Sequence, residues 1–261
     1  MGTSAKNPLQ VQLIKTGLYL VSGGGANTLI RMSGNGLVLV DGKLPDSYDY
    51  LRAKVKRISD LPVRALILTN ADPAHTGTNA KFLEAGAHLI ANQDAGLPMS
   101  ANDSPRPTGA LPPIVTFDHE YTLKIGGIEA QLMHYGRAKT GGDTVVYFPN
   151  LKVVAVGDLY AALPNPDYSH GGSLVGWGPV LAQIMKLDFD VAIPSAGQPI
   201  TRTDLEAFQT KIDTLVSRAT ELVKTGVPKD QLMARLKTDD LGWHFDFTPN
   251  QIDSFYAELH H

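Results

Sequence analysis

The order in which strand-like and helix-like segments follow one another constrains the fold of this chain more than any other feature. The expected strands are short apolar runs bounded by turn residues, and they cover 18–21, 28–32, 36–41, 63–69, 114–117, 120–125, 128–134, 144–148, 152–156 and 191–194. The expected helices carry apolar residues at helical spacing, and they cover 46–59, 76–85, 175–186, 202–225, 229–236 and 248–260. This order favours a layered α/β sandwich, because strands come first and are followed by a helix, a βα unit, more strands, and then a helix and a strand.

The composition is that of a folded protein without metal-binding thiolates. The chain has 261 residues, of which 43% are hydrophobic and 19% charged, which excludes global disorder. A net charge of −3 argues against a nucleic-acid or anionic-membrane binder. The absence of cysteine excludes disulfides, thiolate zinc sites and cysteine nucleophiles. Because no linker-like stretch or repeat interrupts the chain, we expect a single domain over 8–261, with a helical extension from about 202.

No membrane or targeting segment is expected. No apolar run approaches the roughly 20 residues that span a bilayer, and the start of the chain, 1–6, has no apolar core of a signal peptide. The native compartment stays unknown, and export of a trimmed mature form is left open. The glycine-rich stretch 22–25 precedes a hairpin and not a helix, which argues against a dinucleotide site. We assign no function to His260 and His261.

Several segments, in this order along the chain, resemble the metallo-β-lactamase superfamily. They are 36–41, 66–69, 76–79, 140–149, 152–159 and 193–197. The resemblance implies a four-layer αββα sandwich with its active site along one edge of the sheets. The additional C-terminal helices are similar to extensions in some members.

The same resemblance implies a metal site whose ligands are mostly replaced. The family's ligand positions correspond here to Asn70, Asp72, Ala74, His75, Lys139, Asp158 and Ala196. Only His75 and Asp158 keep the family's residue types. Zinc in proteins needs three or four N, S or O ligands at about 2 Å, and a protonated lysine is no ligand. We therefore expect no family-type dinuclear zinc centre and no other cofactor, and we leave open one oxygen-ligated ion, such as manganese or magnesium, at Asp72, His75 and Asp158.

Charge balance suggests what replaces the metal. We hypothesise that Lys139 lies between Asp72 and Asp158 and supplies the missing positive charge. At about 4 Å and an effective dielectric of 20, one such attraction is worth roughly 4 kcal/mol before desolvation. Lys139→Ala is then expected to destabilise the fold more than the surface change Lys152→Ala.

The candidate catalytic residues of this remnant site are Asp72, His75, Lys139 and Asp158. Asn70 and His170, the latter in the loop 168–172, are added as candidate binding residues. Purely structural roles remain open at this stage. Asp158 could cap a turn, His75 could be a satisfied structural histidine, and Asp72 precedes a proline, as is common where turns begin.

Two functions follow from these residues. The first is a metal-free protein without zinc-hydrolase activity that binds a small molecule or a protein partner in the former cleft. The alternative is a hydrolase that works without metal, or with a single metal, through Asp72, His75, Lys139 and Asp158. No Gly-x-Ser-x-Gly or Ser-x-x-Lys motif offers another nucleophile. Ligand, partner and oligomeric state stay unknown.

Overall fold

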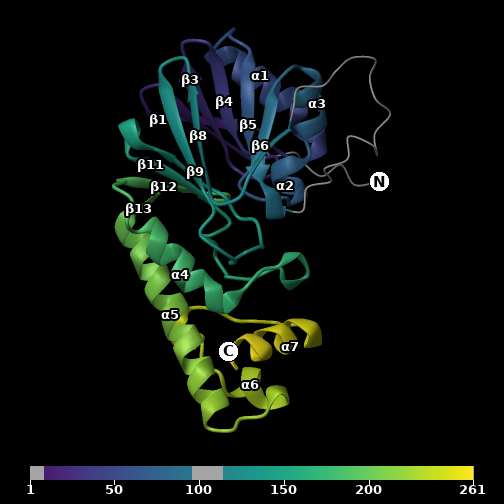
Figure 1. Ribbon diagram of the computed structural model, residues 1–261, viewed down its shortest axis with the longest axis vertical. Coiled ribbons are helices and arrows are strands. Elements are labelled where there is room, and N and C mark those ends of the chain that lie inside the picture. The colour runs from purple at the N-terminus through teal and green to yellow at the C-terminus, as the bar shows by residue number, and fades with distance from the viewer. Residues whose placement is uncertain (1–8, 96–113, 261) are drawn as a thin grey trace.

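Two β-sheets form the centre of the molecule in a computed structural model that describes residues 9–95 and 114–260 (Figure 1). The first sheet has seven strands in the order β1-β2-β3-β4-β5-β6-β7. They span Gln10–Lys15, Leu18–Ser22, Thr28–Ser33, Gly36–Val40, Val63–Ile67, His88–Asn92 and Ile114–Phe117. The second sheet has six strands in the order β13-β12-β11-β10-β9-β8. In chain order, β8 to β13 span Glu120–Ile125, Ile128–Met133, Val145–Phe148, Val153–Gly157, Val191–Pro194 and Ile200–Thr201.

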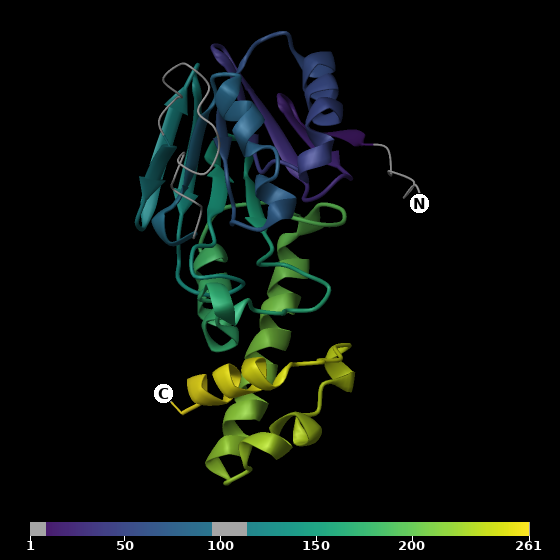
Figure 2. The same ribbon diagram turned by 90° about the vertical axis from the view of Figure 1, so that its right-hand side faces the viewer.

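Helices cover the outer face of each sheet. On the first sheet lie α1 (Tyr48–Ile58) and α3 (Asn79–Glu84), with Leu51 and Phe82 buried against the sheet, while α2 (Pro73–Thr76) lies at its edge in the segment after β5. On the second lie α4 (Leu174–Ile184) and the first half of α5 (Arg202–Lys224). A third buried cluster fills the space between the sheets (Figure 2). The four-layer αββα sandwich expected from the sequence is confirmed.

Strands that face an apolar layer on both sides carry apolar residues at every position. All five residues of β4 and of β11 are buried. In β8 the residues alternate between exposed and half-buried, because one face of this edge strand meets solvent. Continuous apolar runs in the sequence therefore correctly predicted the fully buried strands.

The C-terminal helices extend beyond the sandwich. Helix α5 begins at a capping box, in which Thr201 Oγ1 accepts from the backbone of Asp204 and Asp204 accepts from the backbone of Thr201. It runs from the sheet edge to the far end of the molecule, where α6 (Lys229–Arg235) and α7 (Pro249–Glu258) lie (Figure 1). The three expected C-terminal helices are confirmed within a few residues. The single domain over 8–261 stays a prediction, and residues 8 and 261 lie outside the described part, as do 1–6.

The sequence analysis missed three strands and one break. Strands β1, β6 and β13 were not expected, and of the helix expected over 76–85 only α3 forms within that range, while Thr76 ends α2. The break falls at Gly77, where a Cβ would lie 2.4 Å from Pro45 Cδ, so the close approach of these segments requires glycine. In the described residues, no helix has the length and apolar character of a membrane span.

Candidate functional site

The candidate site lies where four central strands end. Strands β4 and β5 pair in parallel in one sheet, and β11 and β12 pair in parallel in the other. Parallel strands place their carboxyl ends at the same edge of a sheet. The segments that follow these strands therefore meet there, and they carry Asp41, the stretch 70–75, Asp158 and Ser195.

Buried hydrogen bonds tie the two sheets together at this edge. The Asn27 side chain donates to the carbonyls of Pro194 and Gly197, and its backbone N–H donates to Ser195 O at 2.7 Å. The preceding turn needs glycine at Gly25, where φ is +123° and a Cβ would lie 2.8 Å from Ala74 O. The glycine-rich stretch is thus a close-packed wall of the site.

His75 lies between two carboxylates. Its Nδ1 is 3.0 Å from Asp41 Oδ2, and its Nε2 is 3.2 Å from Asp158 Oδ2. Thr69 fixes the first contact, since its backbone N–H and its hydroxyl both donate to Asp41, at 2.8 Å and 2.7 Å. Asp41, His75 and Asp158 therefore form one charged network. The side chains of His75 and Asp41 are 2% and 3% exposed, and that of Asp158 is 20% exposed.

This network keeps His75 protonated at neutral pH. Burial alone would lower its pKa, but the charge of Asp41 and hydrogen bonds with Asp158 and Asp41 raise the pKa of His75 to about 10. An imidazolium has no lone pair on either ring nitrogen. His75 can therefore donate a proton here but cannot accept one.

Asp158 is held as a carboxylate by three neighbours. Its Oδ2 accepts from Asn70 Nδ2 at 2.8 Å, and its Oδ1 accepts from the Ser195 hydroxyl. Burial would raise its pKa, but hydrogen bonding to His75 and the charge of His75, with the bonds from Ser195 and Asn70, place the pKa of Asp158 well below its ordinary value. Asn70, expected as a binding residue, thus serves to hold Asp158.

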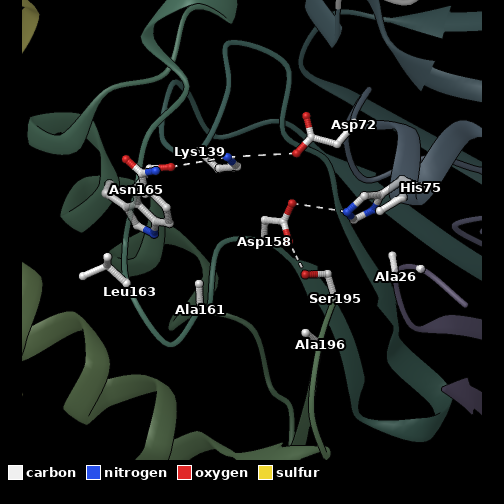
Figure 3. A pocket seen from close by; sticks show the side chains of 13 residues that line it. Ala26, Asp72, His75, Lys139, Asp158, Ala161, Leu163, Asn165, Ser195 and Ala196 are labelled. Carbon is white, nitrogen blue, oxygen red and sulfur yellow. Dashed lines mark hydrogen bonds and ion pairs between the residues drawn. The ribbon is translucent and has the colours of Figure 1, made fainter. Parts of the chain in front are cut away.

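Lys139 contacts Asp72 but is not the partner of Asp158. Its Nζ lies 4.0 Å from Asp72 Oδ2 and donates to Asn165 O at 3.3 Å. We expected Lys139 between the two acids; among the ion pairs of the described residues, the partner of Asp158 is His75 (Figure 3). The positive charge beside Asp158 therefore comes from His75.

The loop that carries Lys139 is braced by a buried acid. Asp143 accepts from the backbone N–H of Thr140 at 2.8 Å and from its hydroxyl at 2.7 Å. Burial raises the pKa of Asp143 to about 7, against the opposing effect of these bonds. Thr144 N–H also donates to Thr69 O at 2.7 Å, so the loop is attached to the segment that carries His75.

A cavity of about 380 Å³ opens over this network. Its walls are Gly25, Ala26, Asp72, Ala74, His75, Lys139, Asp158, Ala161, Leu163, Asn165, Trp177, Ser195 and Ala196 (Figure 3). The four candidate catalytic residues all line it. His170 does not: its side chain is 65% exposed, and its Nδ1 lies 2.7 Å from Asp167 Oδ2.

The contacts of Lys139 revise its expected contribution to stability. Its side chain is 21% exposed, and that of Asp72 is 37% exposed, so water screens their long contact. We now expect Lys139→Ala and Lys152→Ala each to lower the free energy of unfolding by about 1 kcal/mol or less, as for other surface pairs. Thermal or urea melts of the two variants would measure this. A loss for Lys139→Ala several times that for Lys152→Ala would restore the original hypothesis.

A second buried cation, Lys43, was missed by the sequence analysis. It is 0% exposed, and its ammonium donates to Val21 O at 2.7 Å and to Ala26 O. Burial lowers the pKa of Lys43 to about 7, although the charge of Asp41 acts in the opposite direction. By bonding both sides of the glycine-rich turn, Lys43 holds Ala26 at the cavity wall.

The donors at the expected ligand positions do not fit a family-type zinc centre. Ala74 and Ala196 offer no side-chain ligand atom. Lys139 brings an ammonium to the same cavity. Across 9–95 and 114–260, no three His, Asp or Glu side chains are grouped so that they could hold a metal ion.

Asp41, Thr69 and Ser195 are part of the network, yet the sequence analysis did not name them as site residues. Asp41 had a usable signal, because it directly follows the apolar strand β4, just as Asp158 follows β11. Asp41 also has a φ of +62°, which is rare for a residue with a side chain and is a strain often found at functional sites. Ser195 also directly follows an apolar strand, β12, but its contact with Asp158 joins distant segments and could not be read from that position.

Comparison with known proteins identifies the fold. The family model described as the metallo-beta-lactamase superfamily matches residues 22–196. Among curated proteins, the chain is similar to subunit alpha of 2,4-dinitroanisole O-demethylase from Nocardioides sp. (strain JS1661), with 24% identity over 216 residues, or 82% of this chain. The chain spans 65% of the length of that relative.

Two solved structures have the same fold. The metallo-beta-lactamase from Pontibacter korlensis superposes with a TM-score of 0.67 at 19% identity, covering 78% of this chain and 99% of its own. The stereoselective inverting sec-alkylsulfatase Pisa1 from Pseudomonas sp. gives a TM-score of 0.68 at 19% identity, covering 95% of this chain and 47% of its own. At these identities the likeness concerns the fold alone.

Proposed function

The chain belongs to the metallo-beta-lactamase superfamily, and we propose that it is a member without zinc-hydrolase activity that binds a small molecule in the cavity over His75 and Asp158. The observation that carries this proposal is the network Asp41–His75–Asp158, in which both nitrogens of His75 are committed to carboxylates. A protonated histidine supplies the positive charge that a metal would otherwise bring to Asp158. Without a bound metal, nothing lowers the pKa of an attacking water toward 7.

The cavity itself supports a binding role. Its volume of about 380 Å³ lies in the range of small-molecule sites. Ala161 and Leu163 supply apolar walls, while Lys139, Asp72 and Ser195 supply a few polar groups that can orient a ligand. Lys139 and Asp72 together offer one donor and one acceptor at the same wall, which suits a polar, uncharged group.

A metal-independent or single-metal hydrolase is the second candidate, and one comparison favours it. The relative from Nocardioides is named as a subunit of a demethylase, so a chain of related sequence belongs to an enzyme. With His75 protonated, the proton acceptor in such a reaction would be Asp72, whose carboxylate is 37% exposed and lines the cavity. His75 would serve as a positive charge or a proton donor. Because that relative is named as a subunit, a protein partner of this chain is also to be tested.

Metal analysis combined with a substrate screen distinguishes these functions. Protein purified without chelators is expected to contain well below one zinc per chain and to leave ester, thioester, lactam and lactone substrates unchanged, with or without added zinc. Near-stoichiometric zinc would overturn the proposal. Turnover that needs no metal and is lost in Asp72→Asn, but kept in the surface variant Asp188→Asn, would establish the second candidate instead.

A further inference from the structure

A second cavity adjoins the first at the base of the C-terminal helices. Its volume is about 600 Å³, again within the range of small-molecule sites. The two cavities share Asp158, Ala161, Ser195 and Ala196. The rest of the second cavity is built by the segment after β11, by α5 and by the segment around Trp243.

Aromatic rings form the inner wall of this second cavity. Tyr160 and Phe208 have their ring centroids 4.9 Å apart, and Phe208 meets Trp243 edge to face at 5.6 Å. Phe208 and Trp243 are each 6% exposed, so their positions are fixed by packing against the core. A rigid wall of this kind favours a flat aromatic ring, which contacts the exposed edges of Phe208 and Trp243 and the partly exposed ring of Tyr160.

The charged group at the rim is a lysine. Lys211 Nζ lies 5.7 Å from the centre of the Trp243 ring and donates one hydrogen bond to Leu241 O at 2.9 Å. An ammonium has three N–H donors, so Lys211 retains donors for a ligand. The acid at the same rim, Asp204, already accepts from the backbone N–H and hydroxyl of Thr201, at 2.8 Å and 2.7 Å.

At the inner end, the negative charge of Asp158 is balanced by His75 at 3.2 Å. Lys211 is the positively charged residue among those that line this cavity. We propose that this second cavity binds a planar aromatic anion, with its ring against Tyr160, Phe208 and Trp243 and its carboxylate or phenolate at Lys211.

The test uses the full chain and 2-naphthoate as the probe, with binding followed by calorimetry and by tryptophan fluorescence. We expect 2-naphthoate to bind about tenfold or more tightly than decahydronaphthalene-2-carboxylate, which lacks the π face, and than 2-naphthalenemethanol, which lacks the charge. Equal affinities, or no binding of 2-naphthoate at millimolar concentration, would overturn the proposal.

Two variants place the probe in the cavity. Lys211→Met is expected to weaken 2-naphthoate about tenfold and to leave the neutral alcohol unchanged, whereas Lys224→Met, on the same helix outside the cavity, changes neither. Ala207→Trp fills the cavity and abolishes binding, while Glu206→Trp, next to it but outside the lining, does not. If Lys139→Met weakens binding and Lys211→Met does not, the anion lies in the first cavity and the proposal fails.

Discussion

His75→Ala is expected to lower the free energy of unfolding by about 3–5 kcal/mol at neutral pH, the cost of removing one partner from a buried charge network. The variant leaves Asp41 and Asp158 as neighbouring acids with no positive charge between them, where the native protein places His75 at 3.0 Å and 3.2 Å. Asp41 is 3% exposed and cannot recover solvation without moving. Urea unfolding at pH 7 measures the loss.

The matched control is His119→Ala, because the side chain of His119 is 81% exposed and its pair with Asp118 is a surface contact. We expect that variant to change stability by less than about 1 kcal/mol. Equal free energies of unfolding for His75→Ala and His119→Ala would show that His75 carries no charge in the folded state. The proposed replacement of the metal by an imidazolium would then be wrong.

Opposite pH dependences are expected when His75 and Lys43 are changed one at a time. The pKa of His75 rises from 6.5 unfolded to about 10 folded, so the folded state holds an extra proton between these values and stability falls with pH. The pKa of Lys43 drops from 10.5 unfolded to about 7 folded, so the unfolded state holds the extra proton and stability rises with pH. In the native protein the two contributions largely cancel between about pH 7 and 10.

Each variant removes one of the two contributions. Relative to the native protein, Lys43→Met is expected to lose stability as the pH rises from 7.5 to 9.5, by up to about 1.4 kcal/mol per pH unit. His75→Gln is expected to gain stability over the same range, with a slope of similar size and opposite sign. Urea unfolding at four pH values measures both slopes, and Lys224→Met serves as a control with no change in slope. Parallel profiles for all the proteins would contradict both assignments.

Most of the sandwich could be predicted because buried strands are continuous apolar runs in the sequence. Strands such as β4 and β11 are continuous apolar runs, and α5 carries its buried residues at helical spacing. Strand β1 was missed because its side chains are largely exposed and carry no core pattern. The break at Gly77 was missed because it depends on contact with Pro45, which comes from a different segment.

Part of the candidate site was predicted from the sequence, but Asp41, Thr69 and Ser195 were not, and neither were the pairings. The motif order indicated His75, Asp158, Asp72 and Lys139, and all four line one cavity. The partner of Asp158 was assigned to Lys139 on charge balance alone. Which groups pair depends on the distances between them, because Coulomb attraction weakens with distance. A sum of formal charges contains no information about where the charges lie.

The sequence by itself determined the layered fold and indicated the family, because strand length, apolar spacing and residue identity are local properties. Only the tertiary structure decided that His75 joins Asp41 to Asp158, that Lys43 is buried beneath the glycine-rich turn, and that aromatic residues from the end of the chain line a second cavity beside the first. These features arise where distant segments meet at the carboxyl ends of parallel strands. Burial and partner geometry there set the charge of each group, and no single segment contains that information.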